Sequence, residues 1–328
     1  MATMTVIEAV RSALREEMAR DERVIVLGED VGRKGGVFKA TEGLLAEFGE
    51  ERVIDTPLAE SNIVGTAIGA AINGLLPVAE IQFADFIFPA MDQIVNEAAR
   101  IRYRSNGGYG CPIVIRAPYG GGVHGALYHS QSVEAFFSHV PGLKVVAPAT
   151  PADTKGLLKA AIRDPDPVLF FEHKATYRRV RGEVPDSTDV VVPLGSARIA
   201  RPGRTLTVLA YGLMVHHALQ AAEAVAPEGI DVEVIDLRCL RPLDTATVLR
   251  SVKKTSKVLI VHEDNKTGGF GAELAALIAE EAFEYLDGPI TRVCGPDVPA
   301  MPFAPPLEAE FMLDPEKIAA AIRKLAAY

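Results

Sequence analysis

Cysteine is scarce in this chain, which has three in 328 residues. Cys111, Cys239 and Cys294 are odd in number, lie far apart and form no CxxC pair. The sequence therefore predicts neither a disulfide framework nor a zinc site. We expect these cysteines to be small buried apolar side chains in a protein of the reducing cytoplasm.

An excess of positive charge is also missing. The chain has 34 lysines and arginines against 43 aspartates and glutamates, and its formal net charge is −9. Nucleic-acid binding needs a basic face that contacts phosphates, so nucleic acid is not an expected partner.

Long hydrophobic runs are absent, because no stretch of 18 residues is continuously apolar. The best candidate, residues 67–79, is interrupted by Asn73, Gly74 and Pro77. The sequence therefore predicts no transmembrane helix and no membrane partner.

The first 30 residues predict a capped helix rather than a signal peptide. Thr5 and Glu8 have the spacing of a capping box. Glu8, Glu16 and Glu17 lie where a signal peptide needs an apolar core, so no secretory signal is expected.

Strand and helix patterns alternate along the whole chain, which predicts mostly parallel sheets covered by helices. Residues 174–204 interrupt this alternation with charged residues, proline and glycine, so we expect two α/β domains, 1–185 and 186–328. The expected strands are 24–27, 78–83, 112–116, 144–147, 168–172, 206–211, 232–237, 258–261 and 290–293, and the expected helices include 92–103, 151–163, 215–225, 245–254, 270–286 and 315–327.

Residues 55–94 contain the most informative pattern. One acid, Glu60, comes directly before a helix of small residues that begins near Ser61, and a strand and three phenylalanines follow. A lone acid at a helix start more often only stabilises the helix dipole. A carboxyl group among small and aromatic residues is also suited to acid–base chemistry.

Several ordered segments together favour the chemical interpretation. The chain resembles the β subunit of the thiamine-diphosphate-dependent 2-oxo acid dehydrogenases, the decarboxylating first components of the branched-chain, pyruvate and acetoin dehydrogenase complexes. The resemblance covers essentially the whole chain and rests on VLGEDVG (26–32), DTPLAE (55–60), EIQFADFIFPAMDQI (80–94), PYGGGVHGALYHSQS (118–132), LRCLRPLD (237–244) and RVCGPDVP (292–299).

The resemblance implies a fold and a set of site residues. The fold would be a parallel-sheet, pyrimidine-type thiamine-diphosphate-binding domain followed by a smaller α/β domain like the C-terminal domain of transketolase. Glu60 would act on the aminopyrimidine of the cofactor, and His129 would act on the substrate and the lipoyl group. The implied cofactor-binding residues are Glu29, Leu58, Ala59, Glu60, Gln82 and Phe86, and the implied substrate-binding residues are Phe83, Ala84, Asp85, Phe86 and His129.

The family's motif for diphosphate and magnesium, GDG followed by a pair of asparagines, does not occur in this sequence. The resemblance assigns that motif to a separate α subunit. It therefore implies that magnesium is held mainly by the α subunit, and that an α2β2 heterotetramer is needed for activity.

Two further sites are expected from the resemblance. The run AIRDPDP (161–167) is similar to a potassium loop, with Ile113, Ala161, Asp164 and Asp166 as candidates; a turn built by Asp and Pro explains it equally well. Acids near the end of helix 270–286, with the carboxylate of Tyr328, are expected to receive the dihydrolipoyl acyltransferase core, although a solvated helix face is an even alternative. Those acids are Glu280, Glu281, Glu284 and Asp287.

The favoured function is the oxidative decarboxylation of a branched-chain 2-oxo acid with acyl transfer to lipoyl-lysine. Pyruvate and acetoin enzymes are the alternatives within the family. A transketolase-like enzyme would need the diphosphate motif on the same chain, and the presence of Glu60 and His129 opposes a non-catalytic scaffold.

Overall fold

The computed structural model describes residues 1–188 and 190–328. These residues form two compact units. The N-terminal unit comprises Met1–Tyr119 and Phe136–Leu194, and the C-terminal unit comprises Gly120–Ala135 and Gly195–Tyr328. The chain finally passes to the C-terminal unit after Leu194, inside the charged stretch 174–204 and beyond the position 185/186 expected from the sequence. The segment 120–135, which contains His129, joins the C-terminal unit, and nothing in the sequence pattern indicated this.

The N-terminal unit is built on a parallel sheet with the strand order β6-β7-β5-β4-β2-β3. Most of its strand residues are buried, as expected for a parallel sheet with helices on both faces. The strands are β2 (Val24–Gly28), β3 (Val53–Asp55), β4 (Leu76–Glu80), β5 (Val114–Tyr119), β6 (Lys144–Val146) and β7 (Val168–His173).

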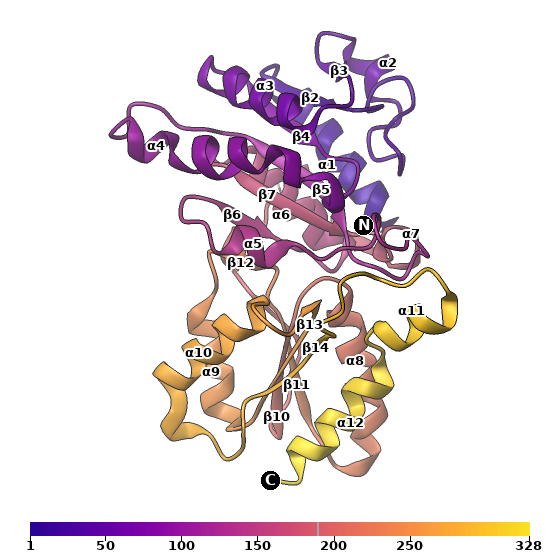
Figure 1. Cartoon of the computed structure of the whole chain (residues 1–328), viewed down its shortest axis with the longest axis vertical. Helices are drawn as coiled ribbons and strands as arrows, with labels where there is room; N and C mark the ends of the chain where they lie inside the picture. Colours follow the sequence, from indigo (N-terminus) through magenta and orange to yellow (C-terminus); the bar gives the residue numbers. More distant parts are fainter. Residues whose placement is uncertain (189) are drawn as a thin grey trace. The chain divides into compact units, whose positions relative to one another are not determined.

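Helices α1 (Val6–Arg20) and α6 (Pro151–Ile162) pack on each other, and α3 (Glu60–Ile72) packs on β4 (Figure 1). The predicted capping box of α1 is confirmed, because the Thr5 side chain accepts from the Glu8 main chain and Glu8 accepts from the Thr5 main chain. Shorter elements complete the unit: β1 (Ala2–Thr5), β8 (Arg181–Val184), α2 (Leu44–Phe48), α4 (Ile101–Arg104), α5 (Glu134–Ser138), which begins in the C-terminal unit, and α7 (Thr176–Arg179).

The helix expected over residues 92–103 is only partly regular. Gln93–Glu97 form a π-helical turn and Ala98–Arg100 a 3₁₀ turn before α4 begins at Ile101. Periodicity of apolar residues cannot distinguish these hydrogen-bond patterns, because the side chains still alternate between inside and outside.

The C-terminal unit contains a sheet in the order β14-β13-β10-β11-β9, in which only β9 runs antiparallel to its neighbour. Helices α9 and α10 pack together, as do α8 and α12, and Figure 1 shows the two pairs on opposite faces of the sheet. The elements are β9 (Arg198–Arg201), β10 (Leu206–Ala210), α8 (Leu213–Val225), β11 (Val232–Asp236), β12 (Cys239–Arg241), α9 (Thr245–Thr255), β13 (Val258–Asn265), α10 (Phe270–Ala282), β14 (Thr291–Gly295), α11 (Pro305–Phe311) and α12 (Pro315–Ala326).

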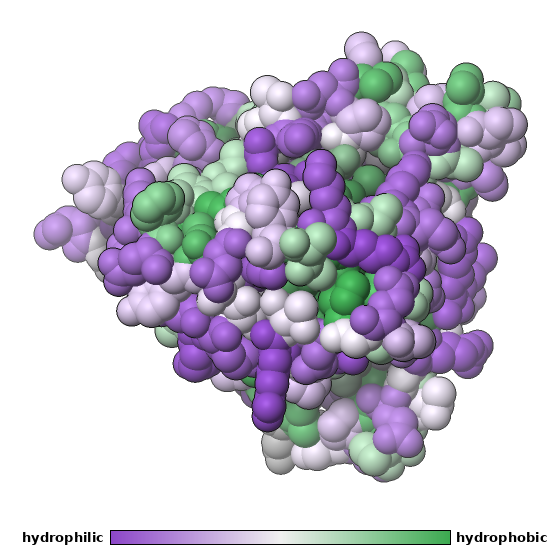
Figure 2. Space-filling view, turned by 90° about the horizontal axis from the view of Figure 1, so that it is seen from below, coloured by the Kyte–Doolittle hydropathy of each residue, from purple (hydrophilic) through white to green (hydrophobic). Residues whose placement is uncertain are grey.

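Among residues 1–188 and 190–328, no helix has the length and apolar content needed to cross a bilayer. Figure 2 shows hydrophilic residues over most of the face in view, with hydrophobic residues in small separate groups.

Two of the three cysteines are buried as expected, namely Cys111 and Cys239. Cys294 is only partly buried, and its Sγ lies 3.2 Å from Nε2 of His262. Burial raises the pKa of the Cys294 thiol to about 11, and burial lowers the pKa of His262 to about 4. This pair is therefore uncharged near neutral pH and does not resemble a nucleophilic thiolate.

Candidate functional site

Polar side chains follow the carboxyl ends of three neighbouring strands of the N-terminal sheet. Glu29 follows β2, Glu60 begins α3 shortly after β3 ends, and Gln82 comes two residues after β4. Because β4, β2 and β3 are adjacent and parallel, their carboxyl ends meet, which is where α/β sheets bind ligands. We call Glu29, Glu60, Gln82 and the turn before Glu60 the acidic edge.

The two acids of the acidic edge are electrostatically coupled. Burial, the charge of Asp30 and the charge of Glu60 together raise the pKa of Glu29. Both glutamates are half-buried. The side-chain amide of Gln82 points to the same place, with Nε2 3.5 Å from the main-chain oxygen of Glu29. The structure therefore brings together three of the residues that the sequence predicted for cofactor binding.

The turn that leads to Glu60 is held in place by β2 and the loop after it. The Thr56 main chain donates to the carbonyl oxygen of Gly28 at 2.9 Å. The Asp55 carboxylate accepts from the main chains of Gly32 at 2.6 Å and Arg33 at 3.1 Å. Helix α3 therefore starts from a fixed position.

Two residues of this turn have side chains that could contact a ligand. Thr56 Oγ1 is buried and has no hydrogen-bond partner within the described part of the chain. Leu58, predicted to line the cofactor pocket, has 69% of its surface exposed, while Ala59 is half-buried. Thr56 was not predicted as a site residue, although it lies in the DTPLAE segment, because the sequence does not show that its hydroxyl is buried without a partner.

Aromatic rings lie beside the acidic edge. Phe83 makes edge contacts with Phe86, at 5.6 Å between ring centroids, and with Phe38, at 5.3 Å. Tyr177 packs on the other side of Phe38 at 5.2 Å, and Lys174 Nζ lies 5.7 Å from the Phe83 ring centroid. Phe38 is a member of this cluster that the sequence analysis did not identify.

The predicted substrate wall begins differently from the expectation. The strand expected to reach residue 83 ends at Glu80, and Ala84–Phe86 form a 3₁₀ turn instead. Ala84 and Asp85 are buried, whereas Phe83 and Phe86 are half-buried. Successive side chains of a 3₁₀ turn point in three directions around its axis, whereas a continuous strand would have placed them alternately on two faces of the sheet.

A buried charged cluster lies near the carboxyl ends of β4, β5 and β7. Arg116 donates to Glu80 at 2.6 Å and, through Nε and Nη2, to both oxygens of Glu172 at 2.7 and 2.6 Å. Tyr177 donates to Glu172 at 2.5 Å. Burial raises the pKa of Glu80, and the guanidinium of Arg116 opposes that rise. This cluster was missed, because its members are far apart in sequence and each looks like an ordinary strand residue.

The charged cluster also contacts the glycine-rich loop after β2. A Cβ on Gly36 would lie 3.1 Å from Oε1 of Glu80, and Gly36 has a φ of +78°. Glycine is needed at this position for both reasons, the left-handed backbone and the close carboxylate. The cluster therefore supports the loop that follows the acidic edge.

His129 belongs to the segment 120–135 of the C-terminal unit and is half-buried. A Cβ on Gly125 would come within 2.6 Å of the His129 carbonyl oxygen, so the loop folds closely on itself. In the same segment Glu134 accepts from the hydroxyl of Tyr211 at 3.0 Å. His129 is thus held in an irregular loop that folds closely on itself.

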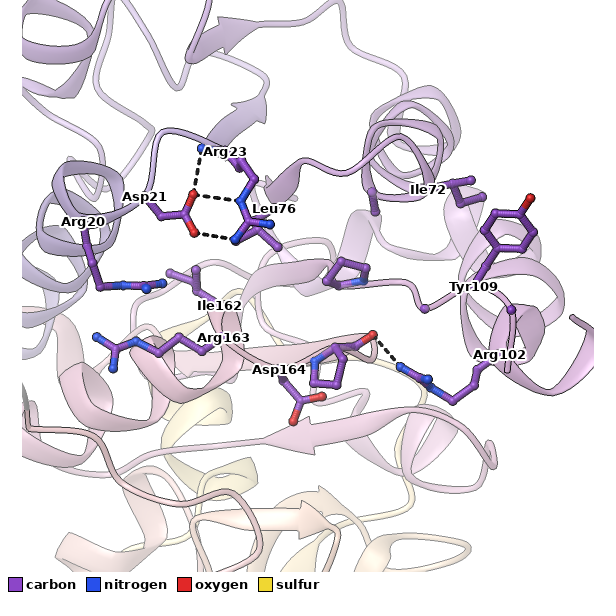
Figure 3. A pocket seen from close by; sticks show the side chains of 15 residues that line it. Arg20, Asp21, Arg23, Ile72, Leu76, Arg102, Tyr109, Ile162, Arg163 and Asp164 are labelled. Carbon is purple, nitrogen blue, oxygen red and sulfur yellow. Dashed lines mark hydrogen bonds and ion pairs between the residues drawn. The ribbon is translucent and has the colours of Figure 1, made fainter. Parts of the chain in front are cut away.

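The predicted potassium loop has its carboxylates already engaged. Both oxygens of Asp164 accept from Lys144 Nζ, at 2.5 and 2.6 Å, and Asp166 accepts from Arg102 Nε at 2.5 Å. Figure 3 shows Asp164 and Arg102 on the wall of a pocket of about 550 Å³. Arg23, Leu76 and Pro112 also line it and lie at or just before the starts of β2, β4 and β5, so the pocket is at the amino-terminal edge of the sheet, opposite the acidic edge.

The two remaining potassium candidates offer carbonyl oxygens that are also in use. The oxygen of Ile113 accepts from Val168, and that of Ala161 accepts from Asp164. A cation at this loop would share oxygens that the chain already uses, and potassium at residues 161–167 stays a prediction.

The acids expected to dock the acyltransferase are all exposed, but they do not form one helical stripe. Helix α10 ends at Ala282 rather than 286, and Glu284 lies in a 3₁₀ turn. The helix expected over 270–286 would have stacked Glu280, Glu284 and Asp287 on one face, and this expectation is wrong because α10 ends before Glu284. A Cβ on Gly288 would lie 3.4 Å from Tyr328 Cβ, which brings the chain's last residue beside these acids.

Comparison with known proteins agrees with this architecture. Residues 2–180 match the transketolase pyrimidine-binding domain, and residues 195–318 match the transketolase C-terminal domain. A solved structure described as a split-gene transketolase, an inactive β4 tetramer, is similar with a TM-score of 0.78 and 27% identity, and the match covers 99% of this chain and 98% of that one.

Curated relatives are similar over nearly the whole chain. The 2-oxoisovalerate dehydrogenase subunit beta of Bacillus subtilis (strain 168) is 60% identical over 100% of both chains. The pyruvate dehydrogenase E1 component subunit beta of the same organism is 49% identical over 93% of each chain. The chain therefore belongs to the family of 2-oxo acid dehydrogenase β subunits, with a transketolase-type pyrimidine-binding domain followed by a transketolase-type C-terminal domain.

Proposed function

We propose that this chain is the β subunit of a branched-chain 2-oxo acid dehydrogenase, the first component of a 2-oxo acid dehydrogenase complex. With an α subunit it would catalyse the thiamine-diphosphate-dependent oxidative decarboxylation of a branched-chain 2-oxo acid and pass the acyl group to lipoyl-lysine. The observation that carries the proposal is the acidic edge, where Glu60 starts a fixed helix beside Glu29 and the phenylalanines, in a chain 60% identical to a 2-oxoisovalerate dehydrogenase β subunit.

The residues of the acidic edge fit an aminopyrimidine ring. Such a ring needs a carboxyl group at one ring nitrogen, hydrogen-bond partners at its rim and apolar contact on its faces. Glu60 offers the carboxyl group, Thr56 Oγ1 is a buried hydroxyl with no partner in the described chain, and Phe86 and Leu58 offer apolar surface.

When bound, thiamine diphosphate would supply the carbon nucleophile and the electron sink for decarboxylation. Glu60 would hold and release a proton at the pyrimidine nitrogen. Glu29, whose pKa is raised by burial and by Asp30 and Glu60, would keep a second proton-carrying group at the same edge. Gln82 would fix the orientation of that edge through its contact with the Glu29 main chain.

His129 would hold the substrate carboxylate or carbonyl and guide the lipoyl sulfur, a role that suits an imidazole because its ring nitrogens can donate and accept hydrogen bonds. Phe83, Ala84, Asp85 and Phe86 would form part of the substrate wall. These assignments come from the family pattern, and the packed loop around His129 supports them.

We infer that an α subunit completes the site in an α2β2 heterotetramer. The sequence contains neither GDG nor a pair of asparagines, so the diphosphate and its magnesium ion would be held mainly by the α subunit. Potassium at the 161–167 loop and a cytoplasmic location stay predictions. The exposed acids near α10, with Tyr328 beside Gly288, are proposed to dock the acyltransferase core.

A pyruvate dehydrogenase β subunit is the alternative function, since such a subunit from Bacillus subtilis (strain 168) is 49% identical to this chain. One or two methylene groups in an apolar pocket change discrimination by only about 10- to 200-fold. The test is to co-purify the chain with its α partner and compare kcat/KM for 3-methyl-2-oxobutanoate, pyruvate and acetoin-derived substrates. Preference for 3-methyl-2-oxobutanoate supports the branched-chain assignment, and preference for pyruvate overturns it.

A further inference from the structure

The loop that carries His129 is fastened by carboxylates from other parts of the C-terminal unit. The Gly121 main chain donates to Oε1 of Glu263 at 2.5 Å, and the His124 main chain donates to Oε1 of Glu308 at 3.2 Å. The Nδ1 atom of the His124 ring lies against the other oxygen of Glu308. Glu308 comes from α11 and is only 3% exposed, so one buried carboxylate engages both the backbone and the ring of His124.

The backbone that Glu308 holds is in an unfavourable conformation. His124 has a φ of +57° and Ala126 a φ of +53°, and side chains with a Cβ rarely adopt this left-handed region. Gly125 lies between them, and a Cβ there would lie 2.6 Å from the His129 carbonyl oxygen and 2.8 Å from His129 Cβ. Residues 124–126 therefore form a strained turn that lies close against His129, with no room for a side chain at Gly125.

The flanks of α11 also pack on the start of the loop. A Cβ on Gly121 would lie 2.5 Å from Met301 Cε and 2.9 Å from Met312 Sδ. Met301 precedes α11 and Met312 follows it. The segment that supplies Glu308 thus contacts the loop on both sides of the carboxylate, so the position of Glu308 relative to His124 is well defined.

We propose that Glu308 is a positioning residue for His129. Its carboxylate stabilises the left-handed turn at 124–126, and the turn fixes the main chain and the side chain of His129. Without the carboxylate, His124 and Ala126 would relax to common backbone conformations, because strained residues persist only where surrounding contacts hold them. The catalytic consequence rests on the role proposed for His129, whereas the fixation of the turn is a property of this chain.

The structural half of the proposal is tested by amide hydrogen exchange on the full chain in complex with its α partner. We expect Glu308→Ala to speed exchange across residues 122–129 by about 10- to 100-fold, the effect of losing a hydrogen bond to a charged acceptor. Glu308→Gln keeps an oxygen acceptor and should restore most of the protection. Glu310→Ala is the matched control, because Glu310 is exposed on the same helix.

His124→Gly gives a second route should Glu308→Ala fail to fold. Glycine removes the ring contact and the steric preference for one backbone region, so exchange across 125–129 should also rise. Unchanged exchange in the folded Glu308→Ala chain, or in His124→Gly if only that variant folds, overturns the proposal.

The functional half is tested by the rate of lipoyl-domain acylation at saturating thiamine diphosphate. Glu308→Ala should lower kcat by at least about 10-fold while the Kd for the cofactor stays within about 2-fold of wild type, since misplacing a catalytic group by about 1 Å costs up to about 100-fold. Glu308→Gln should recover most of the rate. Faster exchange with undiminished acylation would overturn the positioning role.

Failure of the proposed function gives a different result from failure of this inference. A wild-type complex that releases no CO2 from any 2-oxo acid overturns the function, whatever the exchange data show. If the wild-type complex is active but Glu308→Ala leaves the amide exchange of residues 122–129 unchanged, only the inference about Glu308 is overturned.

Discussion

Glu60 and Glu29 lie close enough at the edge of the N-terminal sheet for the charge of Glu60 to act on Glu29. Burial is the first cause that raises the pKa of Glu29, followed by the charges of Asp30 and Glu60. A carboxyl group whose ionisation is disfavoured by burial and by neighbouring carboxylates is suited to holding a proton. The proposed mechanism uses this property, with Glu60 as the group that contacts the cofactor.

The isolated chain is expected to bind thiamine diphosphate and magnesium poorly. The diphosphate carries most of the cofactor's charge, and the sequence has no GDG motif to hold a metal beside it. Calorimetric titration of the purified chain, alone and with its α partner, measures this. Micromolar affinity for the chain alone would contradict the proposed division of the site between two subunits.

Arg116→Met should lower the free energy of unfolding of the N-terminal unit. The substitution leaves Glu80 and Glu172 buried without their guanidinium partner, and breaking such a buried pair typically costs about 3–5 kcal/mol. Urea denaturation gives the free energy of unfolding.

Arg104→Met is the control for the Arg116 substitution. Arg104 pairs with Glu97 at 2.8 Å on the surface, where both side chains are largely exposed. An exposed pair contributes about 0–1 kcal/mol, so this variant should be nearly as stable as wild type. A loss at Arg116 no larger than the loss at Arg104 would contradict the structural role of the buried cluster.

Glu134 should make the stability of the chain fall as pH rises. Burial first, and then the charge of Asp264, raise the pKa of Glu134 to about 8 from an ordinary value of 4.5. The folded state therefore binds the proton more tightly than the unfolded state. The resulting stability is fully present below the unfolded pKa and is lost as pH rises through the folded pKa of about 8.

Glu134→Gln removes this titration but keeps an acceptor for the Tyr211 hydroxyl. The difference in unfolding free energy between about pH 5 and about pH 9 should be smaller in this variant than in wild type, because Glu134 no longer contributes to it. Glu281→Gln, an exposed acid, is the control and should keep the wild-type pH dependence. An unaltered pH dependence in Glu134→Gln would show that Glu134 does not titrate as described.

The sequence predicted most of the regular structure because local signals carry it. The capping box of Thr5 and Glu8 fixes where α1 begins, and the buried apolar runs locate the strands. The pairing of β1 with β8 was not predicted, because these short strands lie about 180 residues apart and lack a distinctive alternation. The sequence predicted that α10 ends at residue 286, whereas it ends at Ala282. The residues after Ala282 are compatible with a helix, so the sequence alone does not mark its end.

The candidate site was predictable only where a family motif marked it. Glu60 and Gln82 lie in recognisable segments. Thr56 lies in the same segment as Glu60, but only the structure shows that its hydroxyl is buried without a partner, and Phe38 became visible through its contact with Phe83. Glu308 gave no signal at all, because its partner His124 is 184 residues away. Tertiary contacts of this kind depend on which elements pack together, and periodicity does not encode that.

Neutralising the exposed acids near α10 should weaken docking of the acyltransferase core. Glu280→Gln/Glu284→Gln removes two negative charges from a surface proposed to receive a basic domain, so association should slow and its salt dependence should decrease. Surface plasmon resonance at low ionic strength measures both rates. Glu310→Gln/Glu316→Gln, which also removes two exposed charges from the C-terminal unit, is the charge-matched control. Equal kinetics for Glu280→Gln/Glu284→Gln and wild type would exclude these acids as the docking site.

The central claim is that Glu60 manages the proton of the cofactor's pyrimidine ring. The most direct measurement is the exchange rate of the cofactor's C2 hydrogen for deuterium in the co-purified α and β complex, with Glu60→Gln compared with wild type and with the exposed-site control Glu51→Gln. A glutamine cannot accept the proton, so exchange should fall by about 100-fold or more while the Glu51 variant matches wild type. An undiminished exchange rate in a folded, cofactor-loaded Glu60→Gln complex would contradict the account.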